Sequence, residues 1–325
     1  FGGSVAFGLS TATNEIASTV GAQIDRSLVK AAGDITVRAT DDASIDSEST
    51  AIAFALSISI GVSFAGGGAN AFNTIRTGTF AAIDRSTADK VPGSDTGLSV
   101  VTTGKTITVL ADSKSETNAE VKAAAMSFGL IAAAAAGTVT ENLLAPTVKA
   151  LLRATEVPGS RDTTQVVVEA RGLQKAMAKS NALAVSTGIS VGTSLAKTVD
   201  SGSITAEIGD DARVTAAVLR ARAVGQDDTY QRASASSGGL ISAVGADTKL
   251  AILATTLVRM GDRGIHNVGL LDLNATRTQN FDATSKNLAV GIFAGSGAAM
   301  STVLTGAADV QIGSSKVNAG SITIK

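Results

Sequence analysis

Residues 51–64 alternate strictly between small and large side chains, and this alternation limits the possible folds more than any other feature of the chain. The segment reads AIAFALSISIGVSF, so that every odd-numbered position is Ala, Ser or Gly and every even-numbered position is large and apolar. A period of two predicts a β-strand, because successive side chains of a strand point to opposite faces. Neither face carries a charge, and we therefore expect both to be buried or shielded from water.

The alternation belongs to a unit that recurs along the whole chain. Further copies lie at residues 4–10, 125–130, 183–195, 240–244 and 288–292, of which the third and fifth in chain order, 125–130 and 240–244, are short or degraded. Each unit opens with an anchor of the type Ile-x-Val-x-Ala, and the anchors begin at Ile35, Ile107, Val166, Leu219, Leu271 and Ile322. These starts are 72, 59, 53, 52 and 51 residues apart, which predicts a basal unit of about 52 residues with insertions in the first two.

A second anchor closes the returning part of each unit. It is an aliphatic residue followed by Asp or Gly at Ile24, Ile83, Ile208 and Ile312, with Leu152 and Val258 as looser equivalents. Such pairs are typical of a strand that enters a tight turn. The extra residues at 85–103 and 156–163 predict an exposed edge where insertions leave the stacking undisturbed. We expect residues 1–325 to form one continuous array of about six units, the first and last incomplete, within a longer chain.

This pattern predicts an all-β fold, a repetitive β-solenoid in which neighbouring units cover one another. The unit allows one wide coil with two long strands or two narrow coils of about 26 residues each. We favour wide, flattened coils, because the uncharged runs exceed a normal strand of about 5–6 residues. Ala, Gly and Ser would make the interior thin. A second internal layer is expected to cover Ile52, Phe54, Leu56 and Ile58, the alternative being an exterior that meets another chain.

Composition excludes several classes of site. The chain has no Cys, which removes disulfides and thiolate chemistry, and only one Tyr and no Trp, which leaves few aromatic platforms for sugars. Its net charge of -1 predicts no binding to nucleic acid. Residues 123–139 are uncharged and nearly long enough for a membrane helix, but their period of two favours a strand, so we expect no membrane insertion.

Three isolated motifs are weak candidates for chemistry. His266 is the only histidine, and we expect it in an exposed turn. Residues 295–300 fall short of the dinucleotide-binding glycine pattern, which indicates small residues in a thin core. Ser27 and Lys30 have the Ser-x-x-Lys spacing but lack the motifs that accompany it in penicillin-binding enzymes.

Two acidic groups could in principle hold calcium, which prefers clustered oxygen ligands. They comprise Asp41, Asp42, Asp46 and Glu48, and Asp84, Asp89 and Asp95. Neither group has the spacing of a known calcium loop, and a solvated face is the favoured interpretation. The sequence thus predicts no catalytic, cofactor-binding or metal-binding residue, with calcium as the one cofactor option.

Three segments together resemble a known class of repeat: GDITVRA at residues 33–39, TFAAID at 79–84 and GKTITV at 104–109. They are similar to the repeats of giant bacterial filamentous haemagglutinin-like and leukotoxin-like adhesins. The resemblance covers essentially the whole chain and implies a secreted, cell-surface or matrix-associated β-helical stalk or filament. It carries over no functional residue, and the insertions and degraded copies depart from strict regularity.

We therefore predict a non-catalytic structural protein, an extracellular stalk, filament or adhesin shaft whose partners are neighbouring repeats of the same longer chain. One alternative is a fibre or sheath subunit that associates laterally with its own kind. The other is a carbohydrate-active β-helix enzyme such as a polysaccharide lyase.

Overall fold

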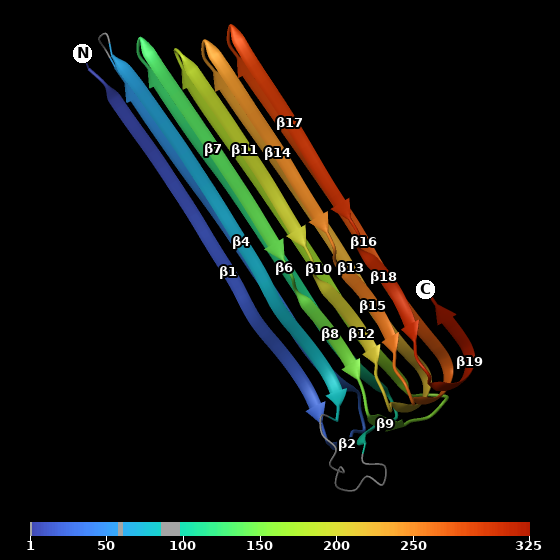
Figure 1. The fold of residues 1–325 in the computed structure, drawn as a ribbon. Helices are drawn as coiled ribbons and strands as arrows, with labels where there is room; N and C mark the ends of the chain where they lie inside the picture. Colours follow the sequence, from blue (N-terminus) through green and yellow to red (C-terminus); the bar gives the residue numbers. More distant parts are fainter. Residues whose placement is uncertain (1, 58–60, 86–97) are drawn as a thin grey trace.

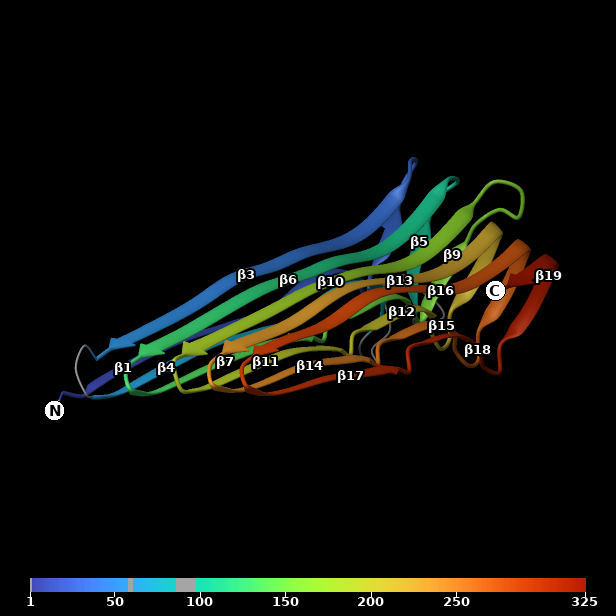
Figure 2. The same ribbon diagram turned by 90° about the horizontal axis from the view of Figure 1, so that it is seen from above.

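The computed structural model describes residues 2–57, 61–85 and 98–325, and within these ranges the chain is all-β with no helix. Two layers of parallel strands face each other, and the chain passes from one layer to the other and back in every coil (Figures 1 and 2). This arrangement is a β-solenoid with wide, flattened coils, as the alternation predicts.

The first layer, sheet A, contains the returning strands. From the second complete coil onward the returning strand is interrupted after its longer first part, at Ala145–Pro146 in that coil. Its members are β1 (Ser4–Asp25), β4 (Val62–Asp84), β7 (Ile131–Leu144), β8 (Thr147–Leu152), β11 (Ile189–Asp200), β12 (Ser203–Ile208), β14 (Ile241–Ile252), β15 (Thr255–Met260), β17 (Phe293–Leu304) and β18 (Ala307–Ile312).

The second layer, sheet B, contains the long outgoing strands and the short strands that precede them. Its members are β2 (Leu28–Lys30), β3 (Ile35–Leu56), β5 (Ser99–Thr102), β6 (Thr106–Phe128), β9 (Thr155–Pro158), β10 (Gln165–Ser186), β13 (Arg213–Gly238), β16 (Ile265–Val290) and β19 (Lys316–Ile324).

Strand register shows that one repeat makes one coil. Ile35 pairs with Ile107, Ile107 with Val166, and the remaining anchors continue this row through Leu219 and Leu271 to Ile322. The wide coil is therefore confirmed over two narrow ones.

The second anchors form an equivalent row in sheet A, with one difference from the sequence alignment. Ile208 pairs with Met260, whereas Val258 pairs with Ala206, so the looser equivalent lies two residues later than expected. Methionine replaces the aliphatic residue at that position, and Gly261 supplies the turn residue that follows.

The interior has two parts of different width. Near the turns that connect sheet B to sheet A, here called the tips, the buried side chains are mostly Ala and Ser. Toward the opposite end the layers move apart (Figure 2) and Ile, Val and Leu fill the space. The thin Ala/Gly/Ser-rich interior predicted from the sequence is thus the tip half of the coil.

The alternation at residues 51–64 spans two strands. β3 ends at Leu56 and β4 begins at Val62, so the chain crosses a tip within this segment. Small residues such as Ala53 are buried, whereas Ile52 is 66% exposed and Phe54 53% exposed. The expected second internal layer is therefore wrong for Ile52, Phe54 and Leu56, because none of the strands in the described ranges covers the outer faces of the tips. Ile58 lies outside the described residues.

Residues 123–139 follow the same plan, since they end β6, cross a tip and begin β7. The membrane-helix alternative for this segment is wrong. Among the residues described, no helix is long and apolar enough to span a membrane.

A short asparagine ladder ties three coils together inside sheet A. Asn14 donates to Asn73 at 3.0 Å, and Asn73 donates to the Asn142 side-chain oxygen at 3.2 Å and to the Ser47 hydroxyl at 2.9 Å. Asn142 in turn donates to the main-chain oxygen of Met177 at 2.8 Å. Buried amides of this kind are stable only while every partner remains in place.

Asn73→Ala is expected to lower the free energy of unfolding by about 1–3 kcal/mol, because it leaves buried polar groups of Asn142 and Ser47, and the half-buried amide of Asn14, without their partner. Asn70→Ala on the same strand is the control, since Asn70 faces outward. Urea denaturation of both variants checks this. Equal losses in the two variants would show that the ladder adds nothing beyond strand propensity.

Candidate functional site

The structure places His266 differently from the exposed turn expected. It is 1% exposed, at the start of β16, and points inward in a row with Val214 and Val317. Burial lowers its pKa to about 4, so the imidazole is neutral near pH 7. The turn ends at Gly264, and strand parity then directs His266 into the aliphatic end of the core.

The other two motifs lie in ordinary strand and turn positions. The Ser27 hydroxyl donates to the main-chain oxygen of Asp25 at 2.6 Å and so stabilises the turn between β1 and β2. Gly295 and Gly297 lie in the middle of strand β17, which leads into no helix. A nucleotide phosphate site of the strand-to-helix type is therefore absent at residues 295–300.

The acidic residues of β3 pair with the next coil instead of gathering around a cation site. Asp42 lies 3.6 Å from Lys114, Glu48 lies 3.3 Å from Lys122, and Asp46 accepts a hydrogen bond from Asn118. Asp41 takes the inward parity of β3 and is half-buried.

The second acidic group is only partly described. Asp84 is buried and binds Arg153 of the next coil through two hydrogen bonds of 3.0 and 2.6 Å. Asp89 and Asp95 lie outside the described residues. Within the part of the chain that the structure describes, no group of three or more His, Cys, Asp or Glu could hold a metal ion.

A buried ionic cluster, not expected from the sequence, lies where the two parts of the interior meet. The side chain of Arg277 on β16 is 4% exposed, and its guanidinium is 2.5 Å from Asp227 of β13 and 3.9 Å from Asp200 of β11. It also donates to Gln174 at 3.2 Å and to Thr256 at 3.2 Å. Three successive coils therefore contribute to one polar cluster in the core.

Local sequence makes room for this arginine. Gly172 and Gly225 occupy the same inward row as Arg277 on the two preceding coils. A Cβ at Gly225 would lie 3.1 Å from the guanidinium and 2.7 Å from the Thr256 hydroxyl. Gly225 thus leaves space for the Arg277 side chain, which reaches Gln174 two coils away, whereas a Cβ at Gly172 would lie 2.6 Å from the Ile204 side chain.

Electrostatics within the cluster favour a proton on Asp200. Burial, and after it the nearby Asp227, raise the pKa of this carboxyl to about 7, although the Gly202 amide and Arg277 act in the opposite direction. The cluster contains two carboxyl groups and one guanidinium, so Arg277 can balance only one negative charge. Asp227 lies closer to Arg277 than Asp200 does, and Asp200 is therefore the carboxyl that favours a proton.

Asp200 and His266 should therefore give opposite pH dependences of stability. The folded pKa of Asp200 is raised, so its contribution is full below about pH 4 and is lost as the pH rises through about 7. The folded pKa of His266 is lowered, so its contribution is full above about pH 6.5 and is lost as the pH falls through about 4.

As the pH rises from 4 to 7, the unfolding free energy of Asp200→Asn should increase relative to that of the parent chain, by up to about 1.4 kcal/mol per pH unit. As the pH rises from 4 to 6.5, the unfolding free energy of His266→Val should decrease relative to that of the parent chain, by up to the same amount per pH unit. Urea titrations at half-unit intervals measure both differences. Parallel profiles for the two variants would contradict the assignment of opposite signs.

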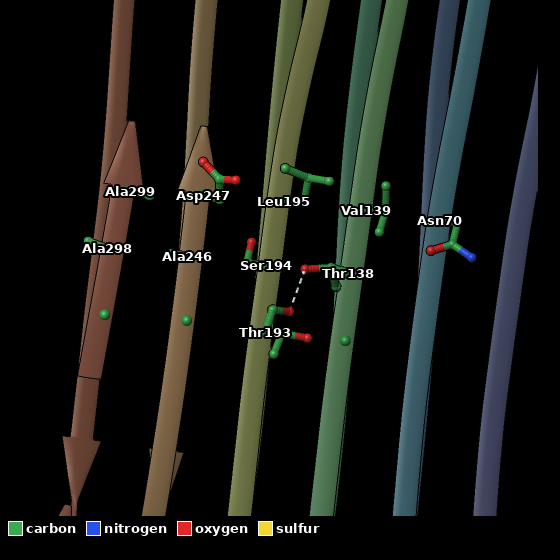
Figure 3. A pocket seen from close by; sticks show the side chains of 13 residues that line it. Asn70, Thr138, Val139, Thr193, Ser194, Leu195, Ala246, Asp247, Ala298 and Ala299 are labelled. Atoms are coloured by element: carbon green, nitrogen blue, oxygen red, sulfur yellow. Dashed lines mark hydrogen bonds between the residues drawn. The ribbon is translucent and has the colours of Figure 1, made fainter. Parts of the chain in front are cut away.

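An open groove crosses the outer face of sheet A near the tips (Figure 3). Gly137, Gly245 and Gly297 occupy one outward row, and Val139 and Leu195 stand beside it in the next row. The only charged residue of the lining is Asp247, which lies 3.3 Å from Lys249. The groove is a strip of small residues with one paired carboxylate, and this is a poor basis for acid–base chemistry.

The tips lie along one edge of the array (Figure 1). Exposed large hydrophobic side chains follow this edge as a band. We call it the apolar rim. Its members are large hydrophobic side chains that point outward on both faces of the tips or lie in their turns: Val5, Phe7, Leu9, Ile52, Phe54, Leu56, Val62, Phe64, Leu130, Ile131, Leu183, Ile189, Val191, Leu240, Ile241, Leu288, Val290, Ile292 and Phe293. Phe54 also packs against Phe128 of the next coil, with ring centroids 6.0 Å apart.

Charged residues are absent from the segments of the sequence that form the rim. The chain has no Asp, Glu, Lys or Arg in residues 49–75, 123–140, 180–196, 233–246 or 287–308, and these segments run through the tips. Outside them, ion pairs link neighbouring coils, as between Glu116 and Lys175 or Glu141 and Lys197. The molecule therefore has polar flanks and one apolar edge.

Comparison with known proteins adds no assignment, since no family model, curated protein or solved structure matches this chain.

Proposed function

We propose that this chain is a non-catalytic structural segment, a rigid shaft in which each coil is held by the coils before and after it. The observation that carries the proposal is the unbroken parallel register, in which equivalent residues of successive coils pair along both sheets. Ladders of this kind extend by adding coils, without a separate core for each unit.

Side-chain contacts also link successive coils along the stacking axis. Arg153 binds Asp84, Arg263 binds Asp211 and Arg220 binds Asp272, each across one coil boundary. The Asn ladder and the Arg277 cluster cross coil boundaries inside the core. These contacts support a role in resisting extension along the stacking axis.

The resemblance to haemagglutinin-like and leukotoxin-like adhesins is the basis for placing the shaft outside a bacterial cell, secreted or at the surface. A Cys-free chain suits that location as well. The lyase alternative is disfavoured in this proposal, because the acidic side chains described on the outer faces include many paired with basic neighbours, such as Glu116, Asp247 and Asp272.

Force spectroscopy with handles at the two ends tests the shaft. Coils that detach one at a time release about 52 residues each, so rupture events should be spaced by roughly 180 Å of contour length. The third complete coil and those after it should give this spacing, and the first two, with their insertions, longer ones. A single rupture that releases the whole chain would contradict a one-dimensional array.

A further inference from the structure

The apolar rim is too large to be an ordinary feature of a solvated surface. A fully buried aliphatic or aromatic side chain removes on the order of 100 Å² of apolar surface from water, and the rim residues are roughly half exposed. Together they present on the order of 1,000 Å², whereas the largest apolar patch of a monomer is usually about 300–600 Å². A surface of this size indicates that another molecule covers it.

The composition of the rim and its border favours a protein partner over a lipid bilayer. Residues that anchor proteins at membrane interfaces are Trp, Tyr and clustered Lys or Arg. The chain has no Trp, and its one Tyr, Tyr230, lies outside the rim. The charged row nearest to the rim on sheet B contains Lys122 and Lys286, which lie three coils apart, and Lys122 is paired with Glu48 and Glu120 of the next row, so these lysines do not form a basic cluster.

We propose that the partner is a second copy of this chain, which packs its own apolar rim against the first. Each rim follows stacked parallel strands, whose spacing of about 4.8 Å is the same in every copy, so two rims match along their whole length. A standard interface buries about 800 Å² per partner, and the rim exceeds this. The rim would then join two shafts side by side through their apolar edges.

This inference goes beyond the shaft and is independent of it. The force measurement reports on the ladders within one chain, whereas association reports on the rim between chains, and either result can fail alone.

Charge substitution in the rim is the first test. Ile131→Lys combined with Ile241→Lys places two buried charges in the interface and should raise the dissociation constant by at least about tenfold per lysine. The matched control combines Leu28→Lys with Ile265→Lys, since these side chains are similarly exposed but lie outside the rim. Circular dichroism verifies that both variants are folded, and sedimentation velocity measures their mass.

We expect the parent chain and the control to be dimeric or larger at micromolar concentration and the rim variant to be monomeric. A parent chain that stays monomeric overturns the proposal, as does a control that dissociates to the same extent. If the parent chain is monomeric but binds vesicles of phosphatidylcholine and phosphatidylglycerol, the rim belongs to lipid instead.

Cross-linking gives an independent measurement, because the chain contains no cysteine. Leu130→Cys and Leu240→Cys each place one thiol at a tip. Under mild oxidation, each variant alone, or the two mixed, should form a disulfide-linked dimer, whereas Leu28→Cys should not. Absence of the rim cross-link in both separate and mixed samples overturns the proposal.

Discussion

Arg277→Met is expected to lower the free energy of unfolding by about 3–5 kcal/mol, more than other single substitutions of a charged residue described in this fold. Among the residues that the structure describes, the guanidinium is the one positive charge paired with Asp227, which is fully buried, and with Asp200, which is 2% exposed. Without it Asp227 remains in the core with an uncompensated charge. Methionine keeps most of the side-chain volume, so a cavity accounts for little of the effect.

Arg263→Met provides the matched control. Arg263 also binds an aspartate of the preceding coil, with 2.8 Å between its Nη2 and the Asp211 carboxylate, but its side chain is 66% exposed. An exposed ion pair contributes about 1 kcal/mol or less. Urea denaturation at pH 7 compares the two. Similar losses would show that burial of the Arg277 cluster does not matter.

A second comparison separates the loss of charge balance from the loss of packing. Combining Arg277→Met with Asp227→Leu and Asp200→Leu removes all three charges, and buried ion clusters replaced by apolar residues are often neutral or more stable by about 1–4 kcal/mol. The triple variant should therefore recover most of the stability lost by Arg277→Met. A further loss would instead indicate that the cluster packs better than an apolar core.

Much of the fold follows from the sequence because register and parity are properties of the pattern itself. Ile35, Ile107 and Val166 were equivalent in sequence and pair in the structure. Parity extends into the polar segments too: Leu271, Leu273 and Arg277 share one parity, as do Leu219 and Asp227. Following that parity would have predicted that Asp227 and Arg277 face the interior.

Other features could not be predicted from the sequence pattern alone. His266 comes two residues after a turn glycine, and only the start of β16 at Ile265 fixes which face it takes. The rim depends on which face of the alternation points inward. Small residues such as Ala53 face the interior because the two sheets are close at the tips, and this places Phe54 outside. The period of two alone does not tell which face of the strand points inward.

The closeness of the two sheets is itself open to test at Gly67. A Cβ built on this inward glycine of β4 would lie 2.7 Å from the main-chain oxygen of Ala124 on the opposite sheet. Gly8 and Gly192 occupy the same row, and a Cβ built on them would lie 2.6 Å from the main-chain oxygen of Ile52 and 2.8 Å from that of Ser236. Main-chain atoms of a paired strand cannot move aside as a side chain can, so this row requires glycine in those three coils.

Gly67→Val should therefore lower the free energy of unfolding by roughly 3 kcal/mol, the upper part of the range for overpacking a core. Gly245→Val is the control, because Gly245 faces outward and a Cβ there meets nothing within 4 Å. In that open position the higher strand propensity of valine should leave stability unchanged or raise it by up to about 1 kcal/mol. Urea denaturation gives the sign of each change. If both substitutions stabilise the chain, the sheets are further apart at the tips than the structure shows. Close approach of the sheets would then not explain why the small residues face inward.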